Sequence, residues 1–323
     1  MSWLIPALTA VVILAALLVS PMGLIWLERR LLAGFQDRHG PNRVGPLGLL
    51  QPVADSLKLF LKEDWVPPFA DRFAFIIAPG IVVVTVLLVF GVIPFAPNFR
   101  VTDLNVGLLF FLGMTSLGVY SIVLGGWASN SKYSLVGALR AAAQMISYEV
   151  PMGLSLVGVV MLAGSFRLGD IVEAQHRVWF CLLQPAGMVI FLIAAVAESR
   201  RTPFDLPEAD TELVQGYHTE YSGMKFGLFL VGEYLDVVLV GAVTTALFLG
   251  GWEAPWFAPH GGGSLAPLIW FAVKTGAVIL LFIWLRSALP RFRFDQLMDF
   301  GWKALLPLSL LNLLITGLVA LAL

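Results

Sequence analysis

The sequence predicts an all-α, polytopic membrane protein with about eight transmembrane helices and one amphipathic helix at the membrane interface. The first observation is composition: 59% of the 323 residues are hydrophobic, only 13% are charged, and the mean hydropathy is +0.87. A soluble domain carries about 25% charged residues, so lipid is the expected solvent. The second observation is a series of apolar segments that are each long enough to cross a bilayer. We expect a single membrane domain over residues 1–323.

The apolar segments are expected to be helices because backbone polar groups in lipid must be satisfied within the segment. The expected spans cover residues 3–27, 73–95, 104–127, 136–163, 178–197, 223–250, 267–285 and 302–322. The first span is preceded by no basic residues and followed by no small-residue cleavage site, so we interpret it as a retained helix.

Basic residues predict the orientation of these spans, because cytoplasmic loops are enriched in Lys and Arg. The loops after the first, third, fifth and seventh spans contain most of them, whereas the opposite side has Arg100, Arg167 and Arg177. This bias places both termini on the outer, periplasmic side of a bacterial-type inner membrane. The two long cytoplasmic loops cover residues 28–72 and 198–222.

The residue inventory excludes several kinds of site. Cys181 is the one cysteine, and a single thiol can neither ligate an iron–sulfur cluster nor close an internal disulfide. There is no glycine-rich nucleotide loop, and His39, His176 and His260 lack metal-ligand spacing. We therefore expect no metal and no cofactor on this chain. His218, beside Tyr217, is interpreted as a surface histidine packed by loop residues rather than as half of a titrating pair.

The first long loop is predicted to contain an interfacial amphipathic helix. Residues 47–62 place apolar side chains at helical spacing, with Asp55, Lys58 and Lys62 largely off that stripe. One interpretation is an ordinary membrane anchor. The other is a gate where a lipophilic ligand enters from the bilayer, with Arg29, Arg38 or Arg43 as donors to its polar head.

The third long loop is unusually acidic for a cytoplasmic segment. Its carboxylates are Glu198, Asp205, Glu208, Asp210, Glu212 and Glu220. Clustered carboxylates disfavour one another's ionisation, so some pKa values should rise toward neutrality and allow proton storage and transfer. A solvated acidic loop is the alternative.

Ionisable residues also lie deep within the spans. Glu149 lies about 20 Å along the fourth span and Glu233 roughly 15 Å along the sixth, with Asp236 three residues further on a similar face. Such groups are costly in lipid and are functional by default. The alternative is a carboxylate neutralised by a structural partner such as Lys274. With the acidic loop, these residues suggest a carboxylate path toward the centre of the bilayer that continues into a neighbouring subunit.

Four segments resemble one known family, in order and over nearly the whole chain. ERRLLAGFQDRHGPNRVG with LQPVADSLKLFLKED, SNSKYSLVGALRAAAQMISYEVPMG, AESRRTPFDLPEADTELVQGYHTEYSGMKF and PRFRFDQLMDFGWKALLP are similar to the quinone-site membrane subunit of respiratory complex I, the proton-translocating NADH:quinone oxidoreductase. The resemblance implies a subunit that carries no cofactor, takes quinone as substrate, and works with flavin and iron–sulfur clusters on partner subunits. The implied partners are peripheral-arm quinone-site and iron–sulfur subunits, small membrane subunits and antiporter-like membrane subunits.

The resemblance also implies roles for individual residues. It places the lining or gate of the quinone chamber at Arg29, Arg38, Asp55, Glu198 and Arg201, with Asp205 beside it. It places an acidic funnel below the chamber at Glu208, Asp210, Glu212 and Glu220, and a buried link toward the pumping arm at Glu149 and Glu233. His39, Ser56 and Asp210 depart from the common pattern, which leaves open whether the quinone is ubiquinone or menaquinone.

Two other functions remain as alternatives. One is the homologous subunit of a membrane-bound, ion-pumping hydrogenase, against which the intact first loop and the FDLPEA motif argue. The other is an independent proton-coupled transporter, which would be expected to show paired repeats with broken helices. No such symmetry is visible in this sequence.

Overall fold

The computed structural model describes residues 4–97, 99–206, 213–255 and 265–322, which form helices and connecting loops with no strand among them. Seven helical segments in this part of the chain are long and apolar enough to cross a membrane. They are α1 (Leu4–Phe35), α3 (Arg72–Phe90), α4 (Gly107–Ala128), α5 (Lys132–Ala163), α10 (Gly223–Phe248), α11 (Ala266–Ala288) and the continuous run α12 (Phe294–Asp299), η3 (Phe300–Leu305) and α13 (Leu306–Ala322). The all-α polytopic fold is confirmed.

The expected fifth span has a different form from the others. Residues 178–197 contain the short helix α7 (Phe180–Leu183) and then α8 (Pro185–Glu198), which is shorter than the seven spanning helices. At 1.5 Å per residue α8 is about 21 Å long, less than the roughly 30 Å of a bilayer core. The break falls at Gln184 because Pro185 lacks an N–H and begins a new helix.

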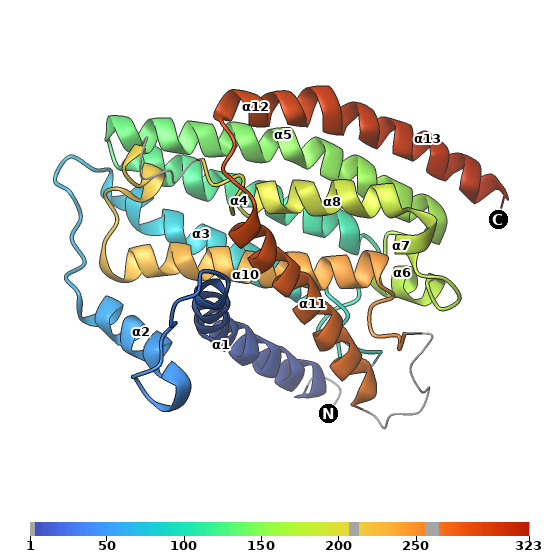
Figure 1. Ribbon diagram of the computed structural model, residues 1–323, viewed down its shortest axis with the longest axis horizontal. Helices are drawn as coiled ribbons and strands as arrows, with labels where there is room; N and C mark the ends of the chain where they lie inside the picture. The colour runs from blue at the N-terminus through green and yellow to red at the C-terminus, as the bar shows by residue number, and fades with distance from the viewer. Residues whose placement is uncertain (1–3, 98, 207–212, 256–264, 323) are drawn as a thin grey trace.

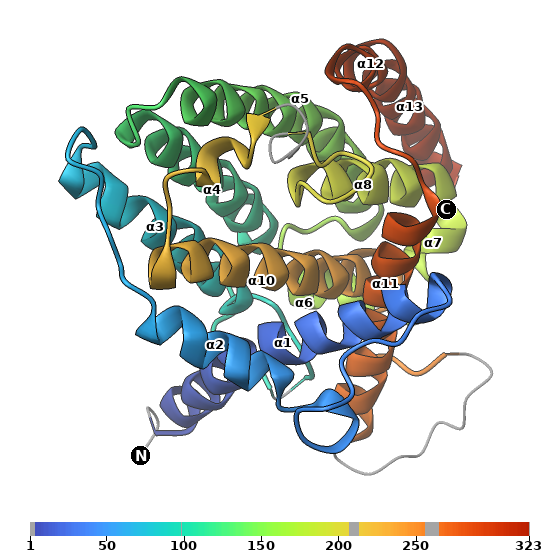
Figure 2. The ribbon, with the colours of Figure 1, turned by 60° about the vertical axis from the view of Figure 1, so that its left-hand side comes forward.

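The bundle is built around α10, the helix that carries Glu233 and Asp236. It lies in the middle of the view in Figure 1 and contacts α3, α11, α1 and α8. Helix α13 lies at one edge of the bundle beside α5, and α1 lies on the other side with α2 (Gln51–Leu61) next to it (Figures 1 and 2). Glu233 and Asp236 are therefore surrounded by other helices.

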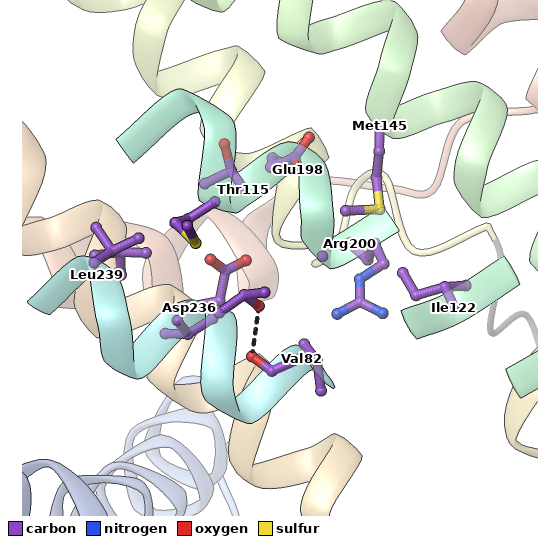
Figure 3. A pocket seen from close by; sticks show the side chains of 13 residues that line it. Val82, Thr115, Ile122, Met145, Glu198, Arg200, Asp236 and Leu239 are labelled. Carbon is purple, nitrogen blue, oxygen red and sulfur yellow. Dashed lines mark hydrogen bonds between the residues drawn. The ribbon is translucent and has the colours of Figure 1, made fainter. Parts of the chain in front are cut away.

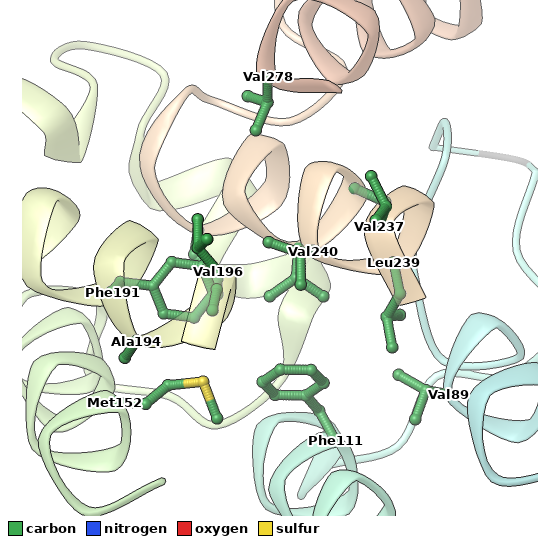
Figure 4. Close-up of a cluster of buried hydrophobic side chains, with 14 of the residues drawn as sticks. Val89, Phe111, Met152, Phe191, Ala194, Val196, Val237, Leu239, Val240 and Val278 are labelled. Atoms are coloured by element: carbon green, nitrogen blue, oxygen red, sulfur yellow. The ribbon is translucent and has the colours of Figure 1, made fainter. Parts of the chain in front are cut away.

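Apolar side chains from several helices meet in the interior and fix the helices relative to one another. Figure 4 shows Phe111 of α4, Phe191 of α8 and Val240 of α10 together with Val89 of α3 and Met152 of α5. All five side chains are buried. Because lipid is as apolar as this interior, close packing of side chains stabilises the bundle more than exclusion of water does.

Contacts between loops agree with the predicted sidedness. Lys225 at the start of α10 forms an ion pair of 2.7 Å with Asp64 of the first long loop. Asn130, which follows α4, donates to the carbonyl of Phe69 in the same loop at 3.2 Å. Arg167 pairs with Asp103, and these residues belong to two of the loops that were predicted to lie on the outer side. The loops assigned to one side thus contact one another.

Two predicted boundaries change in a way that matters for the site. Helix α1 runs to Phe35 rather than ending at residue 27, because residues 28–33 are good helix formers without Gly or Pro. Glu28 and Arg29 therefore lie on a rigid helix. The amphipathic helix is confirmed as η1 (Pro46–Gly48) followed by α2, with Leu57, Phe60 and Leu61 exposed on its outer face.

Candidate functional site

A small cavity inside the bundle brings together ionisable residues from different parts of the chain. Its walls come from α3, α4, α5, α8 and α10, and its polar lining includes Glu198, Arg200 and Asp236, as Figure 3 shows. The volume available to the centre of a water molecule is about 20 Å³. That is enough for roughly one water, and the site is polar enough to hold it.

Glu198 is the most confined carboxyl of this cavity. The residue is 4% exposed, and neither carboxyl oxygen has a hydrogen-bond partner in the part of the chain that the structure describes. Glu149 and Asp236 act on it repulsively, whereas Arg200 attracts it. A buried carboxyl without bonded partners is costly, which makes Glu198 a candidate for a functional role.

Glu149 of α5 lies near Glu198, since its charge acts on that carboxyl. Ser116 of α4 is its hydrogen-bonding side chain, and the Oε1 atom is buried without a partner among the described residues. The structure therefore groups Glu149, Glu198 and Asp236, which come from three helices. The span pattern places Glu149 and Asp236 in the membrane, but it contains no signal for their approach to Glu198.

Glu233 lies in a second buried cluster, toward the third long loop. The hydroxyl of Tyr217 donates to Glu233 Oε1 at 3.3 Å, and Arg200 in turn donates to that hydroxyl. His218 Nε2 lies 4.0 Å from the same carboxyl oxygen. Arg200 also lines the cavity with Glu198 and so links the two groups.

The interpretation of His218 as a surface residue is wrong. The residue is 4% exposed, and its ring packs on the rings of Tyr217 and Phe229. Burial lowers its pKa to about 4, with the charge of Glu233 opposing the shift and that of Arg200 adding to it. The loop folds back onto α10 here, which no local sequence signal indicated.

Glu28 joins three elements through charge, although no motif in the sequence singles it out. It accepts from Arg286 at the end of α11 and lies 3.6 Å from Arg201, which follows α8. The guanidinium of Arg201 also lies 4.2 Å from the centre of the Tyr234 ring. Burial alone would lower the pKa of Arg201, but Tyr234, Glu28 and Glu233 raise it above its usual value. In the sequence, Glu28 stands out only as the first acidic residue, directly before Arg29 and Arg30.

Asp205, in the third long loop, continues the series of buried ionisable residues. Its carboxylate accepts from Arg291 at 2.7 Å, while its Oδ1 atom is buried without a partner among the described residues. Burial raises the pKa of Asp205 above its usual value although Arg291 and Arg286 act in the opposite direction.

Arg29 and Asp55 connect α1 to α2. The guanidinium of Arg29 donates to Asp55 Oδ2 at 2.6 Å, and Lys58 lies 3.8 Å from the other carboxylate oxygen. Partial burial alone would raise the pKa of Asp55, but hydrogen bonds from Arg29 and Gln51 hold it below its usual value. Arg38 is exposed and donates to Gln36 at 2.9 Å, so it does not join this pair.

Several predicted residues do not join these clusters. Glu220 is partly exposed in the turn before α10. Glu208, Asp210 and Glu212 lie outside the described residues.

The suggestion that Lys274 neutralises a buried carboxylate is not supported by its contacts. Its ammonium donates to the carbonyls of Leu249, Gly251 and Glu253 at 2.6, 3.1 and 2.6 Å, just after α10 ends. These carbonyls lie at and beyond the C-terminus of the helix, where such groups lack helical partners. Lys274 therefore fixes the end of α10 rather than its carboxylates.

The described residues contain no group of three or more His, Cys, Asp or Glu side chains that could hold a metal ion. Cys181 is a free, partly buried thiol in α7. The side chains gathered in these clusters can bind through arginines and transfer protons among carboxyls, a histidine and tyrosines.

Comparison with known proteins shows the family of this chain. The NADH dehydrogenase family model matches residues 8–317. The chain is 59% identical over 317 residues to the H subunit of the NADH-quinone oxidoreductase of Methylococcus capsulatus, covering 98% of each chain. It is 56% identical over 303 residues to an H subunit of the same enzyme in Geobacter metallireducens, covering 91% of this chain and 90% of the relative. Neither a hydrogenase subunit nor a transporter is indicated by these names. The chain belongs to the family of NADH-quinone oxidoreductase H subunits, the membrane subunits of respiratory complex I.

Proposed function

We propose that this chain forms much of the quinone-binding chamber of its complex and couples quinone reduction to proton translocation through buried carboxylates. It acts as a subunit of the translocase without a cofactor of its own. The observation that carries the proposal is the run of buried ionisable side chains across the bundle. It passes from Asp205 and Arg291, through Arg201 and Glu233, to the cavity lined by Glu198 and Asp236 and to Glu149 beside Glu198.

The chamber is proposed to lie where the first and third long loops meet. Helix α2 presents exposed apolar side chains to the bilayer, which suits the long apolar tail of a quinone. The pair of Arg29 and Asp55 joins α2 to the end of α1, so it fixes the position of that doorway. Arg38 is exposed nearby in sequence and is available as a donor to a polar head group.

Coupling is proposed to follow from electrostatics. Reduction of a quinone to a quinol consumes two electrons and two protons, so it changes charge at the end of the run where Asp205 lies. Arginines pair with carboxylates at successive points of this run, and Arg200 contacts both clusters. A change of charge at one end therefore changes which carboxyls hold protons further along.

The position in the assembly is part of the same proposal. Peripheral-arm quinone-site and iron–sulfur subunits would cover the cytoplasmic loops and carry flavin and clusters on their own chains. Small membrane subunits and antiporter-like subunits would receive the proton signal from Glu149. Glu208, Asp210, Glu212 and Glu220 would form the acidic funnel between the chamber and the buried clusters. Both termini are proposed to lie on the periplasmic side of the inner membrane.

Variants E149Q and E198Q in membrane vesicles test this function. Both are expected to assemble, to keep electron flow from NADH to ferricyanide, and to lose most of the quinone-dependent proton uptake. D299N is the matched control, because Asp299 forms an exposed pair with Lys303 at 2.7 Å. Wild-type pumping rate and stoichiometry in E149Q and E198Q would contradict the proposal.

A further inference from the structure

His218 lies in a buried group with Tyr217, Arg200 and Glu233. The proposed path uses Glu233 and Arg200 but neither His218 nor Tyr217. Its Nε2 atom lies 4.0 Å from Glu233 Oε1, and the same oxygen accepts from the hydroxyl of Tyr217 at 3.3 Å. Arg200 donates to that hydroxyl. One carboxyl oxygen thus faces a phenol and an imidazole, which are both able to exchange protons.

The surroundings of the ring are apolar. The rings of Phe229 and Phe226 lie 4.9 and 5.5 Å from it, centre to centre, and η2 (Gly216–His218) is covered by the bundle. Among the described residues, Glu233 from α10 and Arg200 from the segment after α8 act on the imidazole through their charge. Helices α5 and α4 also contact η2, and α5 approaches it through Gly137, whose backbone lies against Gly216 and Tyr217.

The chemistry of this pair allows a proton to pass from a protonated Glu233 carboxyl to the imidazole and back. Because burial lowers the pKa of His218 to about 4, its ring is neutral and able to accept a proton. Arg200 opposes a positive ring, whereas an ionised Glu233 favours one. The balance between these two charges decides where the proton resides.

We propose that His218 and Glu233 exchange a single proton, and that Tyr217 holds the carboxyl in position for this step. The O–H bond of the Glu233 carboxyl breaks as an N–H bond forms at His218 Nε2, and the net charge of the pair is unchanged. The 4.0 Å gap closes by a small side-chain movement or is bridged by one water. The pair acts as a proton switch within the carboxylate run, between Asp205 and the cavity of Glu198, and this rests on the proposed function.

The test uses the assembled complex in membrane vesicles, with H218N, H218Q, Y217F and E233Q. Assembly is checked by NADH-to-ferricyanide electron transfer, and inhibitor-sensitive quinone reduction is followed from pH 5 to pH 9. H176N is the control, because His176 is exposed and pairs with Glu253 at 3.3 Å. H218N and H218Q are expected to lower the quinone-linked rate by about tenfold or more and to remove one limb of its pH profile.

A double variant separates proton exchange from a structural role. If the two residues share one proton, E233Q/H218N is no slower than E233Q alone. Additive losses, or a wild-type pH profile in H218N, would overturn the inference, as would assembly of E233Q with failure of both His218 variants to assemble. Unimpaired His218 variants beside impaired E149Q and E198Q would reject this switch alone, whereas unimpaired E149Q and E198Q would reject the proposed function.

Discussion

Asp55 of α2 accepts a hydrogen bond of 2.6 Å from Arg29 of α1, and this contact joins the interfacial helix to the end of a transmembrane helix. The Arg29 side chain is 49% exposed and that of Asp55 26% exposed. An ion pair this accessible to water contributes only about 0–1 kcal/mol to stability. Its importance is therefore expected to lie in the position of α2.

D55N tests the role of this contact in quinone access. The variant is expected to raise the KM for quinone several-fold, because α2 loses its fixed position, while the thermal midpoint of the purified protein changes little. Steady-state kinetics with a short-chain quinone measure the effect. D295N is the control, since Asp295 forms an exposed pair with Arg293 at 3.3 Å. A KM equal to that of the wild type would show that the pair does not govern access.

E28Q tests whether Glu28 holds α1, α11 and the segment after α8 together. Removing one partner from a buried ion pair leaves an uncompensated charge, at a cost of about 3–5 kcal/mol. Arg286 is partly exposed, so the expected loss is at the lower end of that range. Thermal denaturation in detergent measures it, with the exposed variant D299N as control. Equal midpoints for E28Q and the wild type would contradict this role.

K274M tests the contact at the end of α10. Three carbonyls lose their charged donor, and each buried unsatisfied acceptor costs about 1–3 kcal/mol. The ammonium also lies 4.3 Å from the centre of the Trp179 ring, so that cation–π contact is lost. A clearly lower thermal midpoint is expected, whereas K303M, at an exposed lysine, should leave it unchanged. If K274M matched K303M, the carbonyl contacts would not stabilise α10.

The buried neutral histidine predicts a pH dependence of stability. Between about pH 4 and 6.5 the folded protein binds fewer protons at His218 than the unfolded chain does, because burial lowers the pKa of His218 to about 4. The contribution of neutral His218 to the free energy of unfolding is therefore fully present above pH 6.5, and it is lost as the pH falls toward 4. Thermal midpoints at pH 7 and pH 5 should converge in H218N but not in H176N. An unchanged difference in H218N would exclude His218 as the source.

The fold class, the spans to within one short helix, and the presence of acids in lipid could all be predicted from the amino-acid sequence. These features follow from composition, from the length of the apolar segments and from the charge of the loops. All three can be read from short stretches of sequence, and the bilayer restricts each of them strongly. The same patterns placed Asp55 on an amphipathic helix and Glu149 and Glu233 within spans.

Only the tertiary structure shows which charged side chains contact one another. Glu28 contacts Arg286, 258 residues away, and Tyr217 is brought to Glu233 because the third long loop folds back onto α10. The break of the fifth span at Gln184 and the burial of His218 also depend on packing between elements. Electrostatic partners in a bundle are set by which helix faces touch, and no periodicity within one segment contains that information.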